Sequence, residues 1–152
     1  MPLRVREAVL ADADVVIEFN CLLALESEGK TLAPELIAPG VKACLTDPTR
    51  GRYFLAEDDG VILGQMAITR EWSDWRNGWF WWIQSVYVRP ANRRCGVFRA
   101  LFDYVQADAR RDPEVIGLRL YVEEDNHGAQ ETYFRMGMER TEYFLLEKYP
   151  LD

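Results

Sequence analysis

A short polar turn between a predicted strand and a predicted helix carries the residues best suited to chemistry. Val86–Pro90 is typical of the end of an apolar strand, and Ala91–Gly96 follows with two arginines, Arg93 and Arg94. An amphipathic helix begins directly after Gly96. Free backbone N–H groups at a helix start point outward and the helix dipole adds partial positive charge, so a phosphate can bind there without a metal ion. The spacing therefore predicts an anion pocket.

The residues around the glycine decide which phosphate ligand fits this pocket. A Walker loop needs Gly-Lys-Ser/Thr, and a dinucleotide fingerprint needs GxGxxG with an acidic residue on the next strand. Neither pattern occurs around Gly96. What remains is a pyrophosphate site without metal ligands, served by backbone amides and by Arg93, Arg94 and Arg99. Coenzyme A is the common ligand that fits such a site.

A second motif lies further along the chain and reads Asn126-His127-Gly128-Ala129-Gln130-Glu131-Thr132-Tyr133, with a later Gly137. Together with Arg93-Arg94-Cys95-Gly96-Val97-Phe98, it resembles the two ordered signatures of the GNAT superfamily of N-acetyltransferases. Those signatures are Gln/Arg-x-x-Gly-x-Gly/Ala and Asn-x-x-Ala-x-x-x-Tyr. The resemblance covers essentially the whole chain and implies a GNAT-type N-acetyltransferase that uses acetyl-CoA as co-substrate.

The resemblance also implies where acetyl-CoA binds. It places the pantetheine between two splayed strands, 84–88 and 115–122, and the pyrophosphate on the amides of the following loop. The cofactor-binding residues that it implies are Val86, Tyr87, Val88, Arg93, Arg94, Cys95, Gly96, Val97, Phe98, Arg99, Asn126 and Tyr133. Phe98 stands where the family has a small residue, so we expect its amide to donate while its ring turns into the core. No metal ion is expected.

Acetyl transfer to an amine needs a base, an oxyanion donor and an acid. An alkylamine with a pKa of about 10 must lose a proton before it attacks. The resemblance implies a backbone N–H of the 86–88 strand as the oxyanion donor, and Tyr133 as the acid for the leaving thiolate. Gln84 stands where many polyamine-type relatives carry Glu, and a glutamine cannot accept a proton. We therefore assign Gln84 the role of orienting a water molecule, with a nearby carboxylate as the eventual proton acceptor.

The region before Gln84 carries a prediction about the substrate. All five tryptophans lie between residues 72 and 82, and Trp75-x-x-Gly78 resembles the small-amine branch, which includes diamine and thialysine acetyltransferases. Aromatic faces and carboxylates can hold an ammonium group. The predicted substrate and proton-accepting residues are Glu26, Glu28, Trp75 and Glu123. Strand packing or a homodimer contact is the alternative for the tryptophans, and a solvated helix end is the alternative for Glu26 and Glu28.

Hydrophobic periodicity predicts the elements that position these residues. The expected strands cover residues 4–9, 52–56, 61–69, 79–88, 115–122 and 139–149, and the expected helices cover 11–29, 34–45, 97–111 and 126–136. Pro39-Gly40 is expected to divide the second helix. Strict alternation along 79–88 places Phe80, Trp82, Gln84, Val86 and Val88 on one face and Trp79, Trp81, Ile83, Ser85 and Tyr87 on the other.

The order of these elements predicts the fold class. A strand, helix and strand from residue 83 to residue 122 imply a parallel pair with a right-handed crossover. The earlier hairpins are antiparallel. We therefore predict an α+β fold in a single domain over 1–152, with a mixed, mostly antiparallel twisted sheet, a central splayed parallel pair, and helices on both faces.

Composition limits the function classes. With 152 residues and 49% hydrophobic side chains, the chain suits one good core. A net charge of −7 disfavours nucleic acid and acidic membrane surfaces and suits a cationic partner. Three cysteines without a CxxC pair indicate reduced thiols in the cytoplasm. The N-terminus lacks an apolar signal core and the chain lacks about 18 uninterrupted apolar residues, so neither export nor membrane spanning is expected.

The sequence leaves three functional hypotheses open. The first is direct acetyl transfer to a small cationic primary amine, for which the paired motifs are the motivating observation. The second is a non-catalytic acyl-CoA-binding module. It is favoured by Gln84, which stands where many relatives carry Glu, and by Phe98, which stands where the family has a small residue. The third keeps the enzyme but makes the acceptor a protein N-terminus or a lysine.

Overall fold

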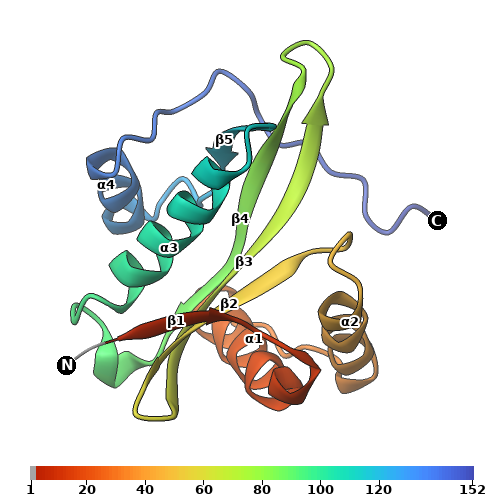
Figure 1. The fold of residues 1–152 in the computed structure, drawn as a ribbon. Helices are drawn as coiled ribbons and strands as arrows, with labels where there is room; N and C mark the ends of the chain where they lie inside the picture. Colours follow the sequence, from red (N-terminus) through yellow and green to blue (C-terminus); the bar gives the residue numbers. More distant parts are fainter. Residues whose placement is uncertain (1–2) are drawn as a thin grey trace. The chain divides into compact units, whose positions relative to one another are not determined.

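A five-stranded mixed sheet forms the centre of the first of two compact units in the computed structural model, which describes residues 3–152. This unit extends to Leu120 (Figure 1). Its strands lie in the order β1 to β5, antiparallel as far as β4, and β4 pairs with β5 in parallel. The strands are β1 (Arg4–Glu7), β2 (Arg52–Asp58), β3 (Val61–Ser73), β4 (Gly78–Val88) and β5 (Val115–Arg119). The predicted α+β class and the parallel strand pair are confirmed, but the pair lies at the edge of the sheet and not at its centre, because residues 139–149 form no strand beside β5.

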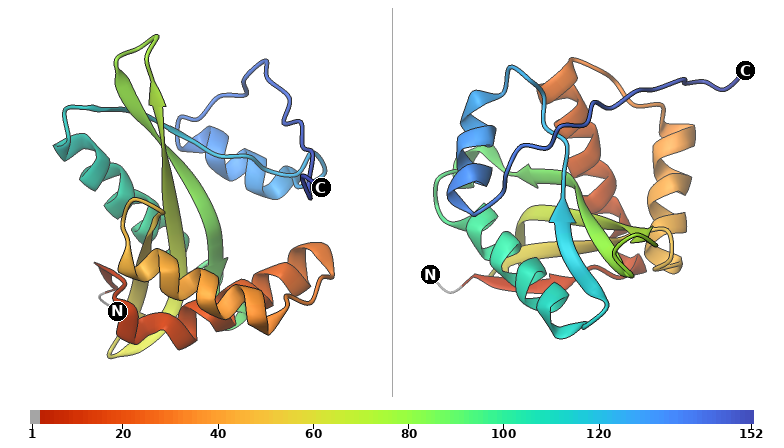
Figure 2. Two further views of the ribbon diagram at one scale, coloured as in Figure 1. Left: turned by 90° about the vertical axis from the view of Figure 1, so that its right-hand side faces the viewer. Right: turned by 90° about the horizontal axis from the view of Figure 1, so that it is seen from above.

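Helices cover both faces of this sheet, as Figure 2 shows. On one face lie α1 (Ala13–Glu28) and α2 (Pro34–Thr46), and on the other lies α3 (Val97–Arg111). Successive strand residues point to opposite faces. Accordingly, the Tyr53 hydroxyl lies 3.1 Å from Asn20 of α1, while the next side chain, Phe54, packs against Tyr104 of α3. Short 3-10 turns at Leu10–Asp12 and Pro90–Asn92 precede α1 and the α3 loop.

The predicted extents of two elements in the first unit are wrong. The second helix is continuous, because Ile37, Val41 and Leu45 recur every fourth residue and pack both halves against the core. Pro39 lies on its exposed face, where water can satisfy the carbonyl that the proline leaves without a donor. The strand predicted over 115–122 ends at Arg119, where its pairing with β4 ends.

The predicted side-chain alternation along β4 breaks at a β-bulge. Gln65 pairs with Tyr87 but Ala67 pairs with Gln84, so Ser85 and Val86 lie opposite the single residue between them. Ser85 has a φ of 46°, in the left-handed region. An extra residue reverses the alternation of the strand. Tyr87 consequently packs on Phe19 of α1, and not on the α3 face with Trp81 as strict alternation would place it.

The second unit, Tyr121–Asp152, contains the helix α4 (His127–Arg135). The strand predicted over 139–149 is wrong: these residues form no strand. A strand needs ladder partners, and within the described chain no backbone-to-backbone hydrogen bond of residues 139–149 is found. None of the helices in the described part of the chain is long and apolar enough to cross a membrane.

Candidate functional site

The two parallel strands separate beside the second half of β4. Their pairing ends at Trp82 and Arg119, and within residues 3–152 no strand pairs with that edge of β4 from Ile83 to Val88. The amide of Arg89 donates to Leu63 of β3 at 2.9 Å. Because neighbouring residues of a strand point their backbone groups to opposite edges, the N–H and C=O of Val88 point away from β3 and into this gap. Of these two groups, the carbonyl accepts a hydrogen bond from Nε of Arg93 at 2.9 Å, and the N–H is left unpaired by the strands of the described chain.

The loop after β4 has the shape of an anion cradle. Arg94 and Gly96 have φ values of 62° and 84°, so the chain turns sharply twice before α3 begins at Val97. The helix start has no side-chain cap. Its first N–H groups thus remain available to a ligand, and the helix dipole favours an anion. The binding of a pyrophosphate by this loop stays a prediction.

The three arginines of the loop region have different surroundings. Arg93 is bound to Val88 and to Glu26 of α1. Arg99 pairs with Asp103 one turn later, at 3.1 Å. Arg94 is exposed, and no carboxylate among the described residues pairs with it. Of the three predicted phosphate ligands, Arg94 is therefore the one whose guanidinium is unengaged.

The side chains that follow Gly96 pack away from the loop. Val97 is buried, and the Phe98 ring lies 6.0 Å from the ring of Phe102, which is itself buried. The Phe98 amide stays in the first turn of α3. The large residue at this position is thus accommodated by packing along the helix.

A buried glutamine supports the β4 bulge, and sequence reasoning missed it. Gln65 is fully buried in β3, and its Nε2 donates to the carbonyl of Ser85 at 3.2 Å. The bulge turns that carbonyl away from the hydrogen bonds between β3 and β4, so the glutamine side chain supplies the donor that the β3 backbone does not. A polar residue inside the apolar run Ile62–Ile68 was the signal that could have identified it.

The predicted catalytic glutamine lies on the face of the sheet covered by α1. Gln84 is half-buried, and its Nε2 donates to the Thr69 hydroxyl at 3.2 Å. Because of the bulge, Gln84 and Tyr87 share this face although they are three residues apart. Its role in orienting a water molecule stays a prediction.

Arginines of the chain itself already cover two of the five tryptophans that sequence analysis offered to a substrate, and the neighbouring Phe80 as well. Arg119 lies 3.6 Å from the ring centre of Phe80, Arg70 lies 4.6 Å from that of Trp79, and Arg52 lies 5.4 Å from that of Trp81. Arg119 and Trp82 both hydrogen-bond to Glu71. In contrast, Trp75 is 89% exposed at the end of the long β3–β4 hairpin seen in Figure 1. Of these aromatic side chains, Trp75 is the one most open to a ligand.

The remaining predicted site residues lie elsewhere. Glu28 is exposed and lies 3.6 Å from Lys30. Asn126, Glu123 and Tyr133 belong to the second unit, where Asn126 caps α4 by accepting a hydrogen bond from the Ala129 amide at 3.2 Å. Burial raises the pKa of the Tyr133 phenol, which therefore stays protonated at neutral pH. Throughout residues 3–152, no three His, Cys, Asp or Glu side chains gather in a way that could hold a metal ion.

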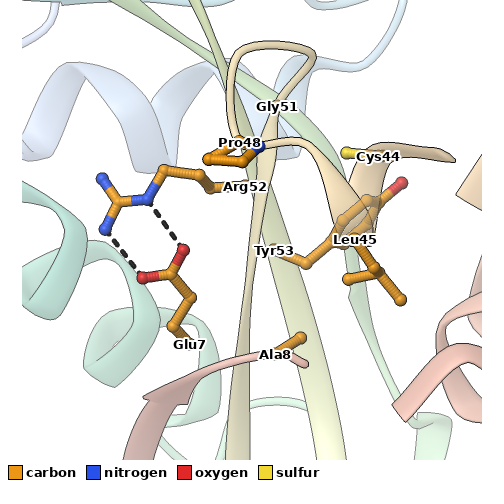
Figure 3. Close-up of a pocket in the computed structure, with 8 residues that line it drawn as sticks. All are labelled: Glu7, Ala8, Cys44, Leu45, Pro48, Gly51, Arg52 and Tyr53. Atoms are coloured by element: carbon orange, nitrogen blue, oxygen red, sulfur yellow. Dashed lines mark hydrogen bonds and ion pairs between the residues drawn. The ribbon is translucent and has the colours of Figure 1, made fainter. Parts of the chain in front are cut away.

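A small cavity lies between β2 and the end of α2, away from the β4 gap (Figure 3). Its volume is about 30 Å³, which is room for a water molecule but not for an acyl donor or an amine. Beside it, Arg52 forms two hydrogen bonds of 2.9 Å with Glu7, and burial raises the pKa of the Cys44 thiol. This cavity is part of the packing and is not the reactive site.

Gly64 of β3 packs closely against the end of β4 and the start of α3, which flank the candidate site. A Cβ at Gly64 would lie 2.9 Å from the Tyr87 carbonyl oxygen and 3.0 Å from Val97. We expect Gly64→Ala to lower the free energy of unfolding by roughly 1–3 kcal/mol, measured by urea unfolding. The matched control is Gly40→Ala in α2, where a Cβ meets no atom within 4 Å and should stabilise by about 0.5–1 kcal/mol. Equal effects of the two changes would contradict the tight contact.

Comparisons with known proteins agree with this geometry. Residues 20–138 match the Acetyltransferase (GNAT) family. The chain is similar to a possible acetyltransferase from Clostridium difficile 630, with 41% identity and a TM-score of 0.90 over 97% of each chain. A predicted acetyltransferase from Clostridium acetobutylicum, solved with acetyl-CoA, shares the fold at 17% identity and a TM-score of 0.78, over 97% of this chain and 96% of that one. A comparison with curated proteins gives no match.

Proposed function

The chain belongs to the acetyltransferase (GNAT) family, and from that premise we propose that it transfers the acetyl group of acetyl-CoA directly to a small cationic primary amine. Family membership makes it an acetyl-CoA-dependent acyltransferase. The acceptor class and the roles of individual residues are our proposal.

One observation carries the proposed cofactor site: the uncapped start of α3 lies directly after the strand edge that β5 leaves open. An extended thiol arm and a pyrophosphate need these two features in succession. The amides of Gly96 to Arg99 and the Arg94 guanidinium would hold the phosphates. The backbone groups of Val86 and Val88 would pair with the amides of the pantetheine arm.

In the proposed reaction the primary ammonium loses two protons: one goes to solvent before attack, and the other leaves nitrogen as the amide forms and replaces the proton that the thiolate receives. The amine nitrogen, once deprotonated, forms a bond to the acetyl carbonyl carbon, and the bond from that carbon to sulfur breaks. A water molecule oriented by Gln84 would take the ammonium proton outward, and a backbone N–H of 86–88 would donate to the carbonyl oxygen. Tyr133 would give a proton to the departing sulfur, because a tyrosine phenol is protonated at neutral pH.

A cationic acceptor is supported by charge. The chain has a net charge of −7, and Glu28 and Glu123 are exposed carboxylates. Trp75, which is 89% exposed, would supply an open aromatic face, whereas Trp79, Phe80 and Trp81 already lie against arginines. Assignment to the diamine branch rests on the sequence pattern around Trp75 and Gly78.

The deciding experiment combines binding with turnover. Acetyl-CoA at a hundred times its Kd should stabilise the protein by about 2.7 kcal/mol, seen as a rise in Tm. Free-thiol release is then followed over a panel of diamines, monoamines, lysine peptides and peptides with free N-termini. We expect release with small diamines first. Absence of any thermal shift would contradict the cofactor assignment. Thiol release with peptides alone would indicate that the acceptor is a protein and not a small amine.

A non-catalytic acyl-CoA-binding module is the second candidate, because Gln84 cannot act as a base and its amide is engaged with Thr69. A thermal shift without thiol release on any member of the panel would support this candidate over the enzyme.

We also propose that the protein forms a homodimer in the cytoplasm. Exposed Trp72 of the hairpin and Ile116 of β5 support an apolar contact, and free Cys21, Cys44 and Cys95 suit a reducing compartment. Light scattering should give twice the mass of the chain, and Ile116→Ser should shift it toward the monomer. A measured mass equal to that of one chain at all protein concentrations would contradict the proposed dimer.

A further inference from the structure

Both oxygens of the Glu26 carboxylate are engaged at the end of α1. The Tyr87 hydroxyl donates to Oε2 at 2.6 Å, and Nη2 of Arg93 donates to Oε1 at 2.7 Å. Nε of Arg93 donates to the Val88 carbonyl at 2.9 Å, and the guanidinium lies 5.5 Å from the centre of the Tyr87 ring. One carboxylate therefore connects α1, the end of β4 and the first residue of the phosphate loop.

The loop needs such a connection because its backbone is strained and its helix start is uncapped. Arg94 has a φ of 62°, a conformation that a non-glycine residue holds only when its surroundings impose it. Arg93 directly precedes Arg94, so fixing the Arg93 side chain restricts the conformations that the strained turn can adopt. An ordered loop binds a ligand with less loss of conformational freedom than a mobile one.

We propose that Glu26 is a positioning residue for the cofactor loop. By holding Arg93 and Tyr87 it keeps the loop amides arranged to receive the pyrophosphate of acetyl-CoA, and it acts through Arg93 without touching the acceptor amine. This inference rests on the proposed function. It differs from the sequence-based expectation for Glu26, which was contact with the acceptor amine.

The charges around Glu26 agree with this role. The hydrogen bond from Tyr87, followed by that from Arg93, lowers the pKa of the Glu26 carboxyl below its ordinary value of 4.5. A lowered pKa means that the ionised form predominates above that value and is lost only as the pH falls through the lower one. The bridge is therefore intact at neutral pH. Burial and then Glu26 raise the pKa of Tyr87, which keeps its hydroxyl a donor.

The test separates the two substrates kinetically. Glu26→Gln keeps the shape and removes the charge, so we expect KM for acetyl-CoA to rise about 3- to 10-fold, with kcat changed less than about 2-fold and KM for the amine unchanged. The matched control is Glu18→Gln. Glu18 also lies on α1 and pairs with an arginine at the end of β4, Arg89 at 3.1 Å, but does not contact the loop. We expect it to leave both KM values unchanged.

A second readout follows the loop without turnover. Cys95 is exposed in the loop, and its Sγ lies 3.4 Å from the Arg93 carbonyl. We expect iodoacetamide to alkylate Cys95 several-fold faster in Glu26→Gln than in the wild type, with acetyl-CoA protecting it and with half-buried Cys21 as the internal reference.

The outcomes are distinguishable. A raised KM for the amine with an unchanged KM for acetyl-CoA would overturn the positioning role and return Glu26 to the acceptor site. Unchanged kinetics and alkylation in a folded Glu26→Gln protein would overturn it as well. Failure of the wild type to bind acetyl-CoA would instead remove the proposed function, and the inference with it.

Discussion

Replacing Gly96 with aspartate is expected to weaken acetyl-CoA binding by roughly 100-fold or more. Gly96 has a φ of 84° and immediately precedes the uncapped start of α3, so an added carboxylate would stand where the pyrophosphate is proposed to lie. Like charges a few ångströms apart at the protein surface repel by about 4 kcal/mol or less. An L-residue in the left-handed region adds about 1–2 kcal/mol of strain. Titration calorimetry with acetyl-CoA and desulfo or dephospho analogues measures the loss.

Gly60→Asp is the matched control for this change. Gly60 has a φ of 80°, and a Cβ there, as at Gly96, would meet no atom within 4 Å. Both variants therefore carry the same added charge and similar backbone strain, and their Tm values should fall by similar amounts. Only the Gly96 variant should lose acetyl-CoA. Equal affinities of the two variants would place the pyrophosphate away from the start of α3.

Tyr133→Phe is expected to lower kcat by about 100- to 1,000-fold while leaving the Kd for acetyl-CoA within about 2-fold. The change removes only the phenolic hydroxyl. A phenol with an ordinary pKa of about 10 already holds its proton at neutral pH, and the burial that raises the Tyr133 pKa does not change this. Stopped-flow detection of free thiol under single-turnover conditions isolates the chemical step from product release.

The control for Tyr133→Phe is Tyr143→Phe, because Tyr143 is 74% exposed and carries no proposed role. It should leave kcat unchanged. A Tyr133→Phe enzyme with wild-type kcat would show that the thiolate leaves without help from this residue. A large rise in the Kd for acetyl-CoA would instead make Tyr133 a binding residue.

Local sequence sufficed to predict the turn before α3 and the helix itself. Gly96 allows the left-handed turn, the lack of Gly-Lys-Ser/Thr and GxGxxG around it argues against nucleotide and dinucleotide loops, and the apolar spacing of 97–109 predicts the helix that follows. These features depend on residues within one or two turns of each other. The parallel strand pair was also predictable, because a strand, a helix and a strand in succession usually form a parallel pair with a right-handed crossover.

Other features could not be read from the sequence, since they depend on residues that are distant in the chain. The β4 bulge is one of them: Ser85 and Val86 share one partner on β3, and Gln65, twenty residues earlier, satisfies the carbonyl that the bulge frees. Strict alternation of side chains along β4 does not predict an inserted residue, so the sequence-based prediction placed Tyr87 on the wrong face of the sheet. The 139–149 pattern has strand-forming residues but, within the described chain, no ladder partner.

The sequence by itself determined the anion-binding turn and the family, because both depend on short motifs whose backbone conformations are set by glycine, proline and helix-start amides. Only the tertiary structure decided which charged groups are still unengaged there. It paired Arg93 with Glu26, and it placed Arg119 and Arg70 on the aromatic rings that could have received a cation. Pairing of charges is decided by packing across elements, since an arginine binds whichever carboxylate or ring the fold brings within a few ångströms.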